Sequence, residues 1–245
     1  MSDLELYLDL LSQPCRAVYI FAKLNEIPFS FHKVNLFKAD KPTNLHLTGV
    51  FARINSLLNV PVLKDGNFKV TESNSMLLYM VRKYKTPDHW YPSDIQKCSR
   101  VDEYLAWQQT NTRYYGCKVF WVKVRIFQFT VLSTPEKVHH VLAEFDIILT
   151  QIEKLFLKDH LFLAGDEISL ADLIAVHRYN YCYGFNVFED RPKLGAWKER
   201  VEEAVGSDLF REAHESILNI KEQHLISLSS ELKKLFKRRL LKLLK

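Results

Sequence analysis

Residues 86–94 divide this chain into two parts whose secondary-structure patterns differ. The segment reads Thr-Pro-Asp-His-Trp-Tyr-Pro-Ser-Asp, and two prolines with Asp and Ser residues in nine positions are typical of an ordered linker. Strand-like and helix-like patterns alternate before it, whereas the pattern after it is helical almost throughout. We therefore predict a first domain over residues 1–86, a linker over residues 87–93 and a second domain over residues 94–245.

The first part predicts the order βαβ followed by ββα. Apolar and polar residues alternate in Leu4–Leu8, and Pro14 begins a helix whose apolar residues recur at helical spacing. The pair Asp65-Gly66 is a strong hairpin signal. Strands are expected at residues 4–8, 29–36, 60–63 and 68–70, and a further helix is expected at residues 72–85. This order implies an α/β domain, a mixed four-stranded sheet with helices packed on it.

The second part predicts an all-helical domain. Apolar residues recur at helical spacing in four segments, residues 101–121, 136–156, 170–181 and 193–205. Ser169 and Asp172 have the spacing of a capping box at the start of the third segment, because Asp172 can accept from the amide of Ser169. The presence of only 7 glycines in 245 residues also favours helices over a loop-rich β fold.

Charge is distributed unevenly along the chain. The net charge is +5, but the last fourteen residues hold seven Lys and Arg residues and no acidic residue, so the remainder carries about −2. We therefore expect no nucleic-acid partner for the body of the protein. The start, Met-Ser-Asp-Leu-Glu, is acidic where a secretory signal would be basic, and no apolar run reaches membrane-spanning length. We expect a cytoplasmic protein without stable membrane insertion.

The cysteines are widely spaced, as expected of reduced thiols in a cytosolic protein: Cys15, Cys98, Cys117 and Cys182. Their spacing matches no zinc motif, so we predict no metal site. We also expect no cofactor. Ser12-Gln-Pro-Cys15 has the spacing of a redox Cys-x-x-Cys motif with the first cysteine replaced. Because a single cysteine cannot close an internal disulfide there, we interpret Cys15 as a packing residue of the helix.

Several features of the first part occur together in one known family. A strand at Leu4–Leu8 is followed by Ser12-Gln-Pro-Cys-Arg16, Val60-Pro61 precedes a strand, and Glu72-Ser73 opens a helix. With His46 between them and a helical part after the linker, the sequence resembles the glutathione S-transferases. The runs that resemble the theta class are Leu4–Lys23, Val101–Gln108 and Leu209–His214. The resemblance implies a thioredoxin-like glutathione-binding domain followed by an all-helical electrophile-binding domain.

Ser12 is the catalytic residue that this resemblance implies. A free thiol has a pKa of roughly 8.5, and only its thiolate is a good nucleophile. A hydroxyl that donates a hydrogen bond to the sulfur of glutathione favours the thiolate, and the start of a helix adds its positive dipole end. Ser12 lies two residues before Pro14, which fits the first turn of a helix. The structural alternative is that Ser12 serves only as the N-terminal cap.

The resemblance also implies how glutathione is held. The backbone amide and carbonyl of Val60, before a cis Pro61, would bind the tripeptide as an added strand. Ser73 at a helix start would hold the carboxylate of the γ-glutamyl group, and Glu72 would accept from its ammonium. Each feature has a structural alternative, an edge-strand proline for Pro61 and plain helix capping for Glu72 and Ser73.

Three more residues are placed at the glutathione site by the resemblance. His46 would reach the glycyl carboxylate, although a loop histidine is more often a solvated surface residue. Asn59 stands where the theta pattern usually has a lysine that helps to hold glutathione. Arg113 aligns with an arginine of the glutathione cleft, or is a solvent-facing helix arginine. Residues 40–44 look like an insertion just ahead of His46.

The C-terminal segment, residues 232–245, is a basic amphipathic stretch. Its leucines and phenylalanine fall near one helical face. The resemblance implies that this helix roofs the electrophile site, with Arg239 nearest the basic position that assists the leaving group and Arg238 as an alternative. A contact with an anionic membrane surface, a nuclear address and a plain closing helix are the other interpretations.

The resemblance implies an enzyme that conjugates the thiolate of glutathione to small hydrophobic electrophiles, with dehalogenation and hydroperoxide reduction as related activities. A homodimer is the expected assembly. One alternative is a non-catalytic relative that binds glutathione or another ligand. Another is a glutaredoxin-like thiol transferase, against which Ser12 at the nucleophile position argues.

Overall fold

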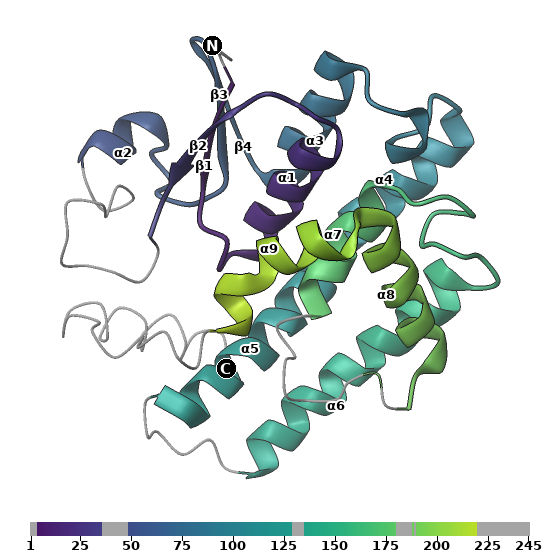
Figure 1. Ribbon diagram of the computed structural model, residues 1–245. Coiled ribbons are helices and arrows are strands. Elements are labelled where there is room, and N and C mark those ends of the chain that lie inside the picture. Colours follow the sequence, from purple (N-terminus) through teal and green to yellow (C-terminus); the bar gives the residue numbers. More distant parts are fainter. Residues whose placement is uncertain (1–3, 36–48, 129–134, 180–187, 189, 220–245) are drawn as a thin grey trace. The chain divides into compact units, whose positions relative to one another are not determined.

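The structure, a computed structural model, describes residues 4–35, 49–128, 135–179, 188 and 190–219. The described residues fall into two compact units, the first taken from Met1–Thr86 and Val205–Arg239 and the second from Pro87–Ala204. The first unit holds the sheet, and the second is helical (Figure 1). None of the described helices is both long and apolar enough to cross a membrane.

The first unit contains four strands and four helices among the described residues. Its strands are β1 (Leu4–Leu8), β2 (Ser30–Lys33), β3 (Val62–Asp65) and β4 (Phe68–Thr71). Its helices are α1 (Gln13–Leu24), α2 (Gly49–Ile54), α3 (Ser73–Tyr84) and, from the end of the described chain, α9 (Ser207–Leu218). The predicted order βαβ then ββα is confirmed for the strands and for α1 and α3. The helix α2 between the two halves was not predicted, β2 is shorter than the expected residues 29–36, and β3 begins two residues later than expected.

The sheet is mixed, as predicted, and its strand order is β2-β1-β3-β4. Strand β1 pairs with β2 in parallel and with β3 antiparallel, and β3 pairs antiparallel with β4. The turn between β3 and β4 contains Gly66 at φ +57, a left-handed conformation that glycine adopts without steric cost. The hairpin signal at Asp65-Gly66 is therefore confirmed.

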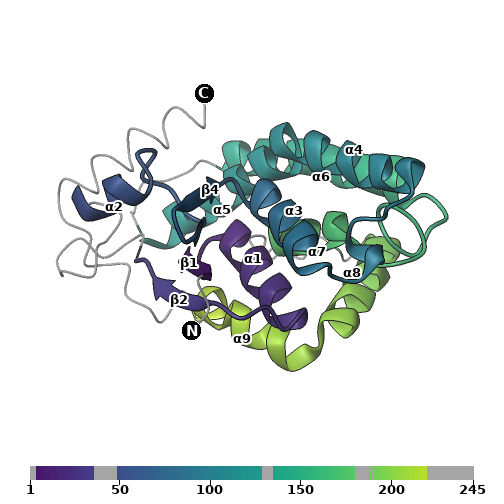
Figure 2. The same cartoon turned by 90° about the horizontal axis from the view of Figure 1, so that it is seen from above.

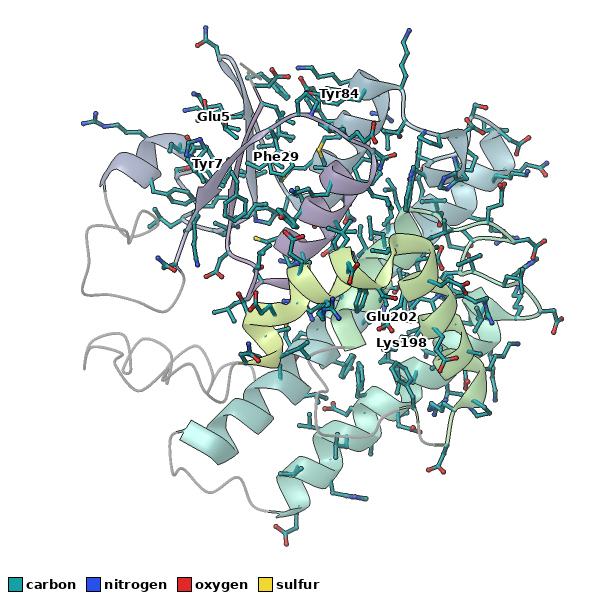
Figure 3. The ribbon with its side chains drawn as sticks, viewed as in Figure 1. Glu5, Tyr7, Phe29, Tyr84, Lys198 and Glu202 are labelled. Carbon is teal, nitrogen blue, oxygen red and sulfur yellow. The ribbon has the colours of Figure 1, made fainter. Side chains whose placement is uncertain are left out.

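The two faces of β1 follow from its alternating sequence. Leu4, Leu6 and Leu8 are buried on one face. Tyr7 projects from the other face, where its ring meets the edge of the Phe51 ring of α2 at a centroid distance of 6.3 Å. Figure 1 and Figure 2 show α2 on one side of the sheet and α1 with α3 on the opposite side. In Figure 3 Tyr7 and Glu5 lie on the side of α2, where Tyr7 donates to Glu5 at 2.7 Å. The leucines therefore face α1 and α3.

The helices of the second unit are α4 (Ile95–Thr110), α5 (Thr112–Gln128), α6 (Pro135–Gln151), α7 (Leu170–Tyr179) and α8 (Pro192–Val205), with a π-helical segment at Ile152–Leu157. The single helix predicted over residues 101–121 is wrong. Asn111, at φ −108 and ψ −91, ends α4, and α5 begins at the next residue. Residues 108–113 are six consecutive polar residues that interrupt the apolar period at this break, so the sequence did carry a signal for it.

A buried carboxylate joins three segments of the second unit. Asp172 accepts from the backbone N–H and the hydroxyl of Ser169 at 3.0 and 2.9 Å. It also accepts from the Leu163 amide and from Nε1 of Trp197, both at 2.8 Å. Ser169 in turn accepts from the Ala171 amide at 3.3 Å, so the predicted capping box at the start of α7 is confirmed. The pKa of the Asp172 carboxyl is raised, because burial outweighs the lowering effect of these hydrogen bonds.

We expect Asp172→Ala to lower the free energy of unfolding by about 3 kcal/mol, because four donors around a fully buried site lose their acceptor. Chemical denaturation measures this change. Asp208→Ala is the control, since the exposed Asp208–Arg211 ion pair contributes little to stability. Equal effects of the two substitutions would contradict a special role for the Asp172 network.

Candidate active site

Three loop segments meet at one end of the sheet. In the strand register Tyr7 of β1 pairs with Val62 of β3, and Val62 pairs with Thr71 of β4. The end of β1, the start of β3 and the end of β4 therefore lie side by side, about 5 Å between neighbouring strands. Asn59, Val60 and Pro61 lead into this end, while Asp9–Ser12 and Glu72-Ser73 leave it.

Ser12 occupies the N-cap position of α1, with φ −83 and ψ 127. Its carbonyl accepts the first helical hydrogen bond, from the Arg16 amide at 3.1 Å. Within the described chain, however, its hydroxyl caps no amide of α1. The hydroxyl instead makes a hydrogen bond with the thiol of Cys15, one turn into the helix. Ser12 is half-buried and lies at the positive end of the α1 dipole.

The segment before β3 contains the predicted cis peptide bond, between Val60 and Pro61. The Val60 side chain is partly buried and packs against the cluster formed by Tyr7, Val34, Phe51 and Val62. This packing fixes the side chain on the α2 face of the sheet. The backbone of Val60 lies just before the first paired residue of β3.

Asn59 is exposed beside this cis bond. Both its backbone oxygen and its Oδ1 accept from Nδ2 of the buried Asn55, at 2.9 and 2.6 Å. Since Oδ1 is used in this way, Asn59 would present its amide N–H groups to a ligand. Such donors suit a carboxylate, but without the positive charge of the lysine that the theta pattern has here.

Glu72 adopts an uncommon backbone conformation at the start of α3. Its φ is 65 and its ψ is 116, a region in which a non-glycine residue is strained. Its carbonyl accepts the first helical bond, from the Met76 amide at 3.0 Å. Ser73, the first residue of α3, is buried with 7% exposure. Glu72 and Ser73 thus place a carboxylate and a hydroxyl at a helix N-terminus, where backbone amides and the helix dipole favour an anion.

The structure therefore brings together Ser12, Asn59, Val60, Glu72 and Ser73, all in the first unit. Arg113 belongs to the second unit, where it lies exposed on α5 and its Nη1 donates to Oε1 of Gln109 at 2.7 Å. The expected contributions of His46 and Arg239, and the insertion at residues 40–44, fall outside the described residues.

Two residues of this site were not singled out from the sequence. Asp9 and Arg16 are both buried, with 6% and 0% exposure, and both form hydrogen bonds with the loop that carries Ser12. The sequence pattern that could have indicated them is one acidic residue three positions before Ser12 and one basic residue four positions after it. Sequence spacing alone does not distinguish such a pair from ordinary surface charges.

Comparison with known proteins identifies the family of the chain. The family model described as the C-terminal domain of glutathione S-transferase matches residues 127–204. Glutathione S-transferase theta-1 of Bos taurus is 53% identical over 222 residues, which cover 89% of this chain and 90% of the relative.

Solved structures of similar fold also exist. Human glutathione S-transferase T1-1 in its apo form is 48% identical, with a TM-score of 0.90 over 99% of this chain and 100% of the other. A human theta-class glutathione transferase, solved in complex with the glutathione conjugate of 1-menaphthyl sulfate, is 41% identical, with a TM-score of 0.87 over 99% and 100% of the two chains. The expected pairing of a thioredoxin-like domain with a helical domain is thereby confirmed, and the chain belongs to the theta class of glutathione S-transferases.

Proposed function

We propose that this protein is a serine-type glutathione transferase that joins the thiolate of glutathione to small hydrophobic electrophiles. The observation that carries the proposal is the position of the Ser12 hydroxyl, which lies at the N-terminus of α1 without capping the described amides of that helix. The human theta-class relative solved with a glutathione conjugate supports the same reaction. The related reactions, dehalogenation and hydroperoxide reduction, would use the same thiolate.

The task of Ser12 is to make the thiolate of bound glutathione available near neutral pH. Lowering the pKa of a thiol by about two units requires roughly 2.7 kcal/mol in favour of the charged form. A hydrogen bond from a hydroxyl to a charged acceptor contributes about 1.5–3 kcal/mol, and a helix N-terminus adds about 0.3–1 kcal/mol. The two effects together are of the required size. The thiolate then attacks an electrophilic carbon, the new carbon–sulfur bond forms, and the leaving group departs with the bonding electrons.

The other segments at this end of the sheet would hold the tripeptide. The backbone of Val60 would pair with extended glutathione as an added strand. Glu72 would accept from the γ-glutamyl ammonium, while Ser73 and the first amides of α3 would donate to its carboxylate. Asn59 would donate to a carboxylate of the ligand. His46 and Arg113 complete the proposed set of glutathione contacts.

The second substrate would bind in the helical domain. We place Arg239 in the C-terminal segment over the electrophile, where a cation would stabilise a departing anion. We further propose a cytoplasmic homodimer that needs no cofactor or metal. A panel of epoxides, alkyl halides and cumene hydroperoxide, each assayed with glutathione, would identify the class of electrophile. A non-catalytic relative would bind glutathione-agarose without turning over any member of the panel.

Ser12→Ala should lower kcat/KM about a hundredfold or more with the best electrophile of the panel, because it removes the donor to the sulfur. The thermal midpoint should change little, since the hydroxyl does not cap α1 within the described chain. Steady-state kinetics and the pKa of the bound thiol, followed by thiolate absorbance against pH, are the measurements. Ser99→Ala on the exposed side of α4 is the control. Retained turnover in Ser12→Ala would refute the role of Ser12.

Glu72→Gln should raise KM for glutathione about tenfold and leave kcat within about threefold, because a neutral amide replaces the carboxylate that would bind the ammonium. Varying glutathione at saturating electrophile measures both constants. Glu26→Gln is a matched control, since Glu26 is also exposed in the first unit and also has a positive φ, of 53. An unchanged KM would exclude Glu72 from the glutathione contacts.

The competing thiol-transferase hypothesis requires a reactive Cys15. Its side chain is wholly buried, and burial raises the pKa of the thiol to about 12, against the lowering effect of hydrogen bonds from the Asp9 backbone and from Ser12. Only a thiolate is a good nucleophile, so Cys15 is unreactive near neutral pH. This supports its interpretation as a packing residue of α1.

Alkylation of the native protein with iodoacetamide near neutral pH should therefore modify the half-buried Cys98 and Cys117 well before Cys15. Peptide mass spectrometry after timed quenching gives the order of labelling. A denatured sample, in which every cysteine is accessible, controls for the detection of each peptide. Preferential labelling of Cys15 in the folded protein, together with deglutathionylation that is lost in Cys15→Ala, would restore the thiol-transferase hypothesis.

A further inference from the structure

The loop between β1 and α1 ends at Ser12. Both carbonyls and both amides of the two peptide units before Ser12 form hydrogen bonds. In the unit between Leu10 and Leu11, the carbonyl accepts from Nη1 of Arg16 at 2.7 Å, and the Leu11 amide donates to Oδ1 of Asp9 at 3.0 Å. In the unit between Leu11 and Ser12, the carbonyl accepts from the same Nη1 at 3.1 Å, and the Ser12 amide donates to the Asp9 carbonyl at 2.8 Å.

Arg16 donates hydrogen bonds to the carbonyls of three consecutive residues of this loop. Its side chain binds the carbonyls of Leu10 and Leu11, and its own amide binds the carbonyl of Ser12 at 3.1 Å. The guanidinium is wholly buried, so water does not compete for these bonds. Hydrogen bonds from an ionised donor are about twice as strong as neutral ones. The peptide planes before Ser12 are therefore fixed in rotation, and with them the direction in which the Ser12 side chain leaves the backbone.

The charges at this loop also act on a sulfur at the first turn of α1. The positive charge of Arg16 favours the thiolate form of Cys15, and the negative charge of Asp9 disfavours it. Glu72 is a further acid at the same end of the sheet. A glutathione sulfur beside Ser12 would be subject to the same groups. Arg16 thus orients the loop by its hydrogen bonds and also stabilises a thiolate by its positive charge. Asp9 orients the loop in the same way, but its negative charge destabilises a thiolate.

We infer that Arg16, together with Asp9, is a positioning residue for the Ser12 hydroxyl, because its guanidinium fixes the two peptide units that precede Ser12. The inference rests on the proposed function, in which Ser12 polarises the thiol of glutathione. Arg16 touches neither substrate in this scheme. It sets the angle at which the hydroxyl meets the sulfur, and a small displacement of a catalytic group has large kinetic consequences.

The test compares Arg16→Lys, Arg16→Gln and Asp9→Ala in the full chain. Arg16→Lys keeps the positive charge but loses the planar donor geometry, whereas Arg16→Gln loses the charge and keeps an amide donor. We expect kcat/KM to fall roughly ten- to a hundredfold in Arg16→Lys, mainly through kcat. We also expect the pKa of bound glutathione to rise in both Arg16 variants. Asp9→Ala should lower kcat as well, and it decides the question if neither Arg16 variant folds.

Arg191→Lys is the matched control for loss of a well-bonded arginine. In the second unit, Arg191 donates to Asp146 Oδ1, Thr150 Oγ1 and Glu153 Oε2, each at 2.7 Å, and its side chain is only 13% exposed. Arg191→Lys should lower the thermal midpoint without moving the pKa of bound glutathione. If the Arg16 variants also lose only stability and keep the wild-type thiol pKa, Arg16 is structural and the inference is wrong.

Ser12→Ala separates the two possible failures. If Ser12→Ala leaves the thiol pKa unchanged, the proposed function of Ser12 fails first. If Ser12→Ala raises the pKa but the Arg16 and Asp9 variants leave both the pKa and kcat unchanged, the proposed function stands and only the positioning role is overturned.

Discussion

The candidate active site depends on the antiparallel pairing of β3 with both of its neighbours. Because Val62 lies opposite Tyr7 on one side and Thr71 on the other, three loops distant in sequence must meet at one end of the sheet. The side chains on β1 then decide which face each helix covers. Leucines bury one face against α1 and α3, and Tyr7 packs with Phe51 of α2 on the other. A slip of one residue in this register would exchange the two faces and separate the loops.

At this end of the sheet, two sulfur environments differ in the balance of burial and hydrogen bonding. The Cys15 thiol accepts hydrogen bonds from the loop, yet burial outweighs them and its pKa is raised to about 12. In the proposed complex, the glutathione sulfur would meet the same helix terminus and the same hydroxyl from outside the core, where desolvation is smaller. The difference explains how one serine can lie between an inert protein thiol and a reactive substrate thiol. It also gives the buried Arg16 a function, since its charge and its hydrogen bonds both act at this terminus.

Much of the fold, and the cis peptide bond before Pro61, could be predicted from the sequence. The period-2 pattern at Leu4–Leu8, the Asp65-Gly66 turn and the capping box at Ser169 and Asp172 are local signals, and each is confirmed. The break at Asn111 was missed, although six consecutive polar residues, 108–113, interrupt the apolar pattern there. The resemblance to the theta class came from local runs, and comparison with whole chains confirms it. The roles assigned to individual glutathione contacts remain proposals.

By itself, the sequence determined the four strands, most of the helices and the family of the chain, because hydrophobic period, turn residues and caps act over a few neighbouring positions. It indicated neither α2 nor α9 as a helix. It also placed a serine at a helix start. Only the tertiary structure decided what that serine does with its hydroxyl, which faces Cys15 rather than an amide of its own helix. It likewise decided that Asp9 and Arg16 are buried partners of one loop instead of surface charges. The physical reason is that burial and hydrogen-bond direction depend on the sheet register and on the helices packed against it, which local spacing does not encode.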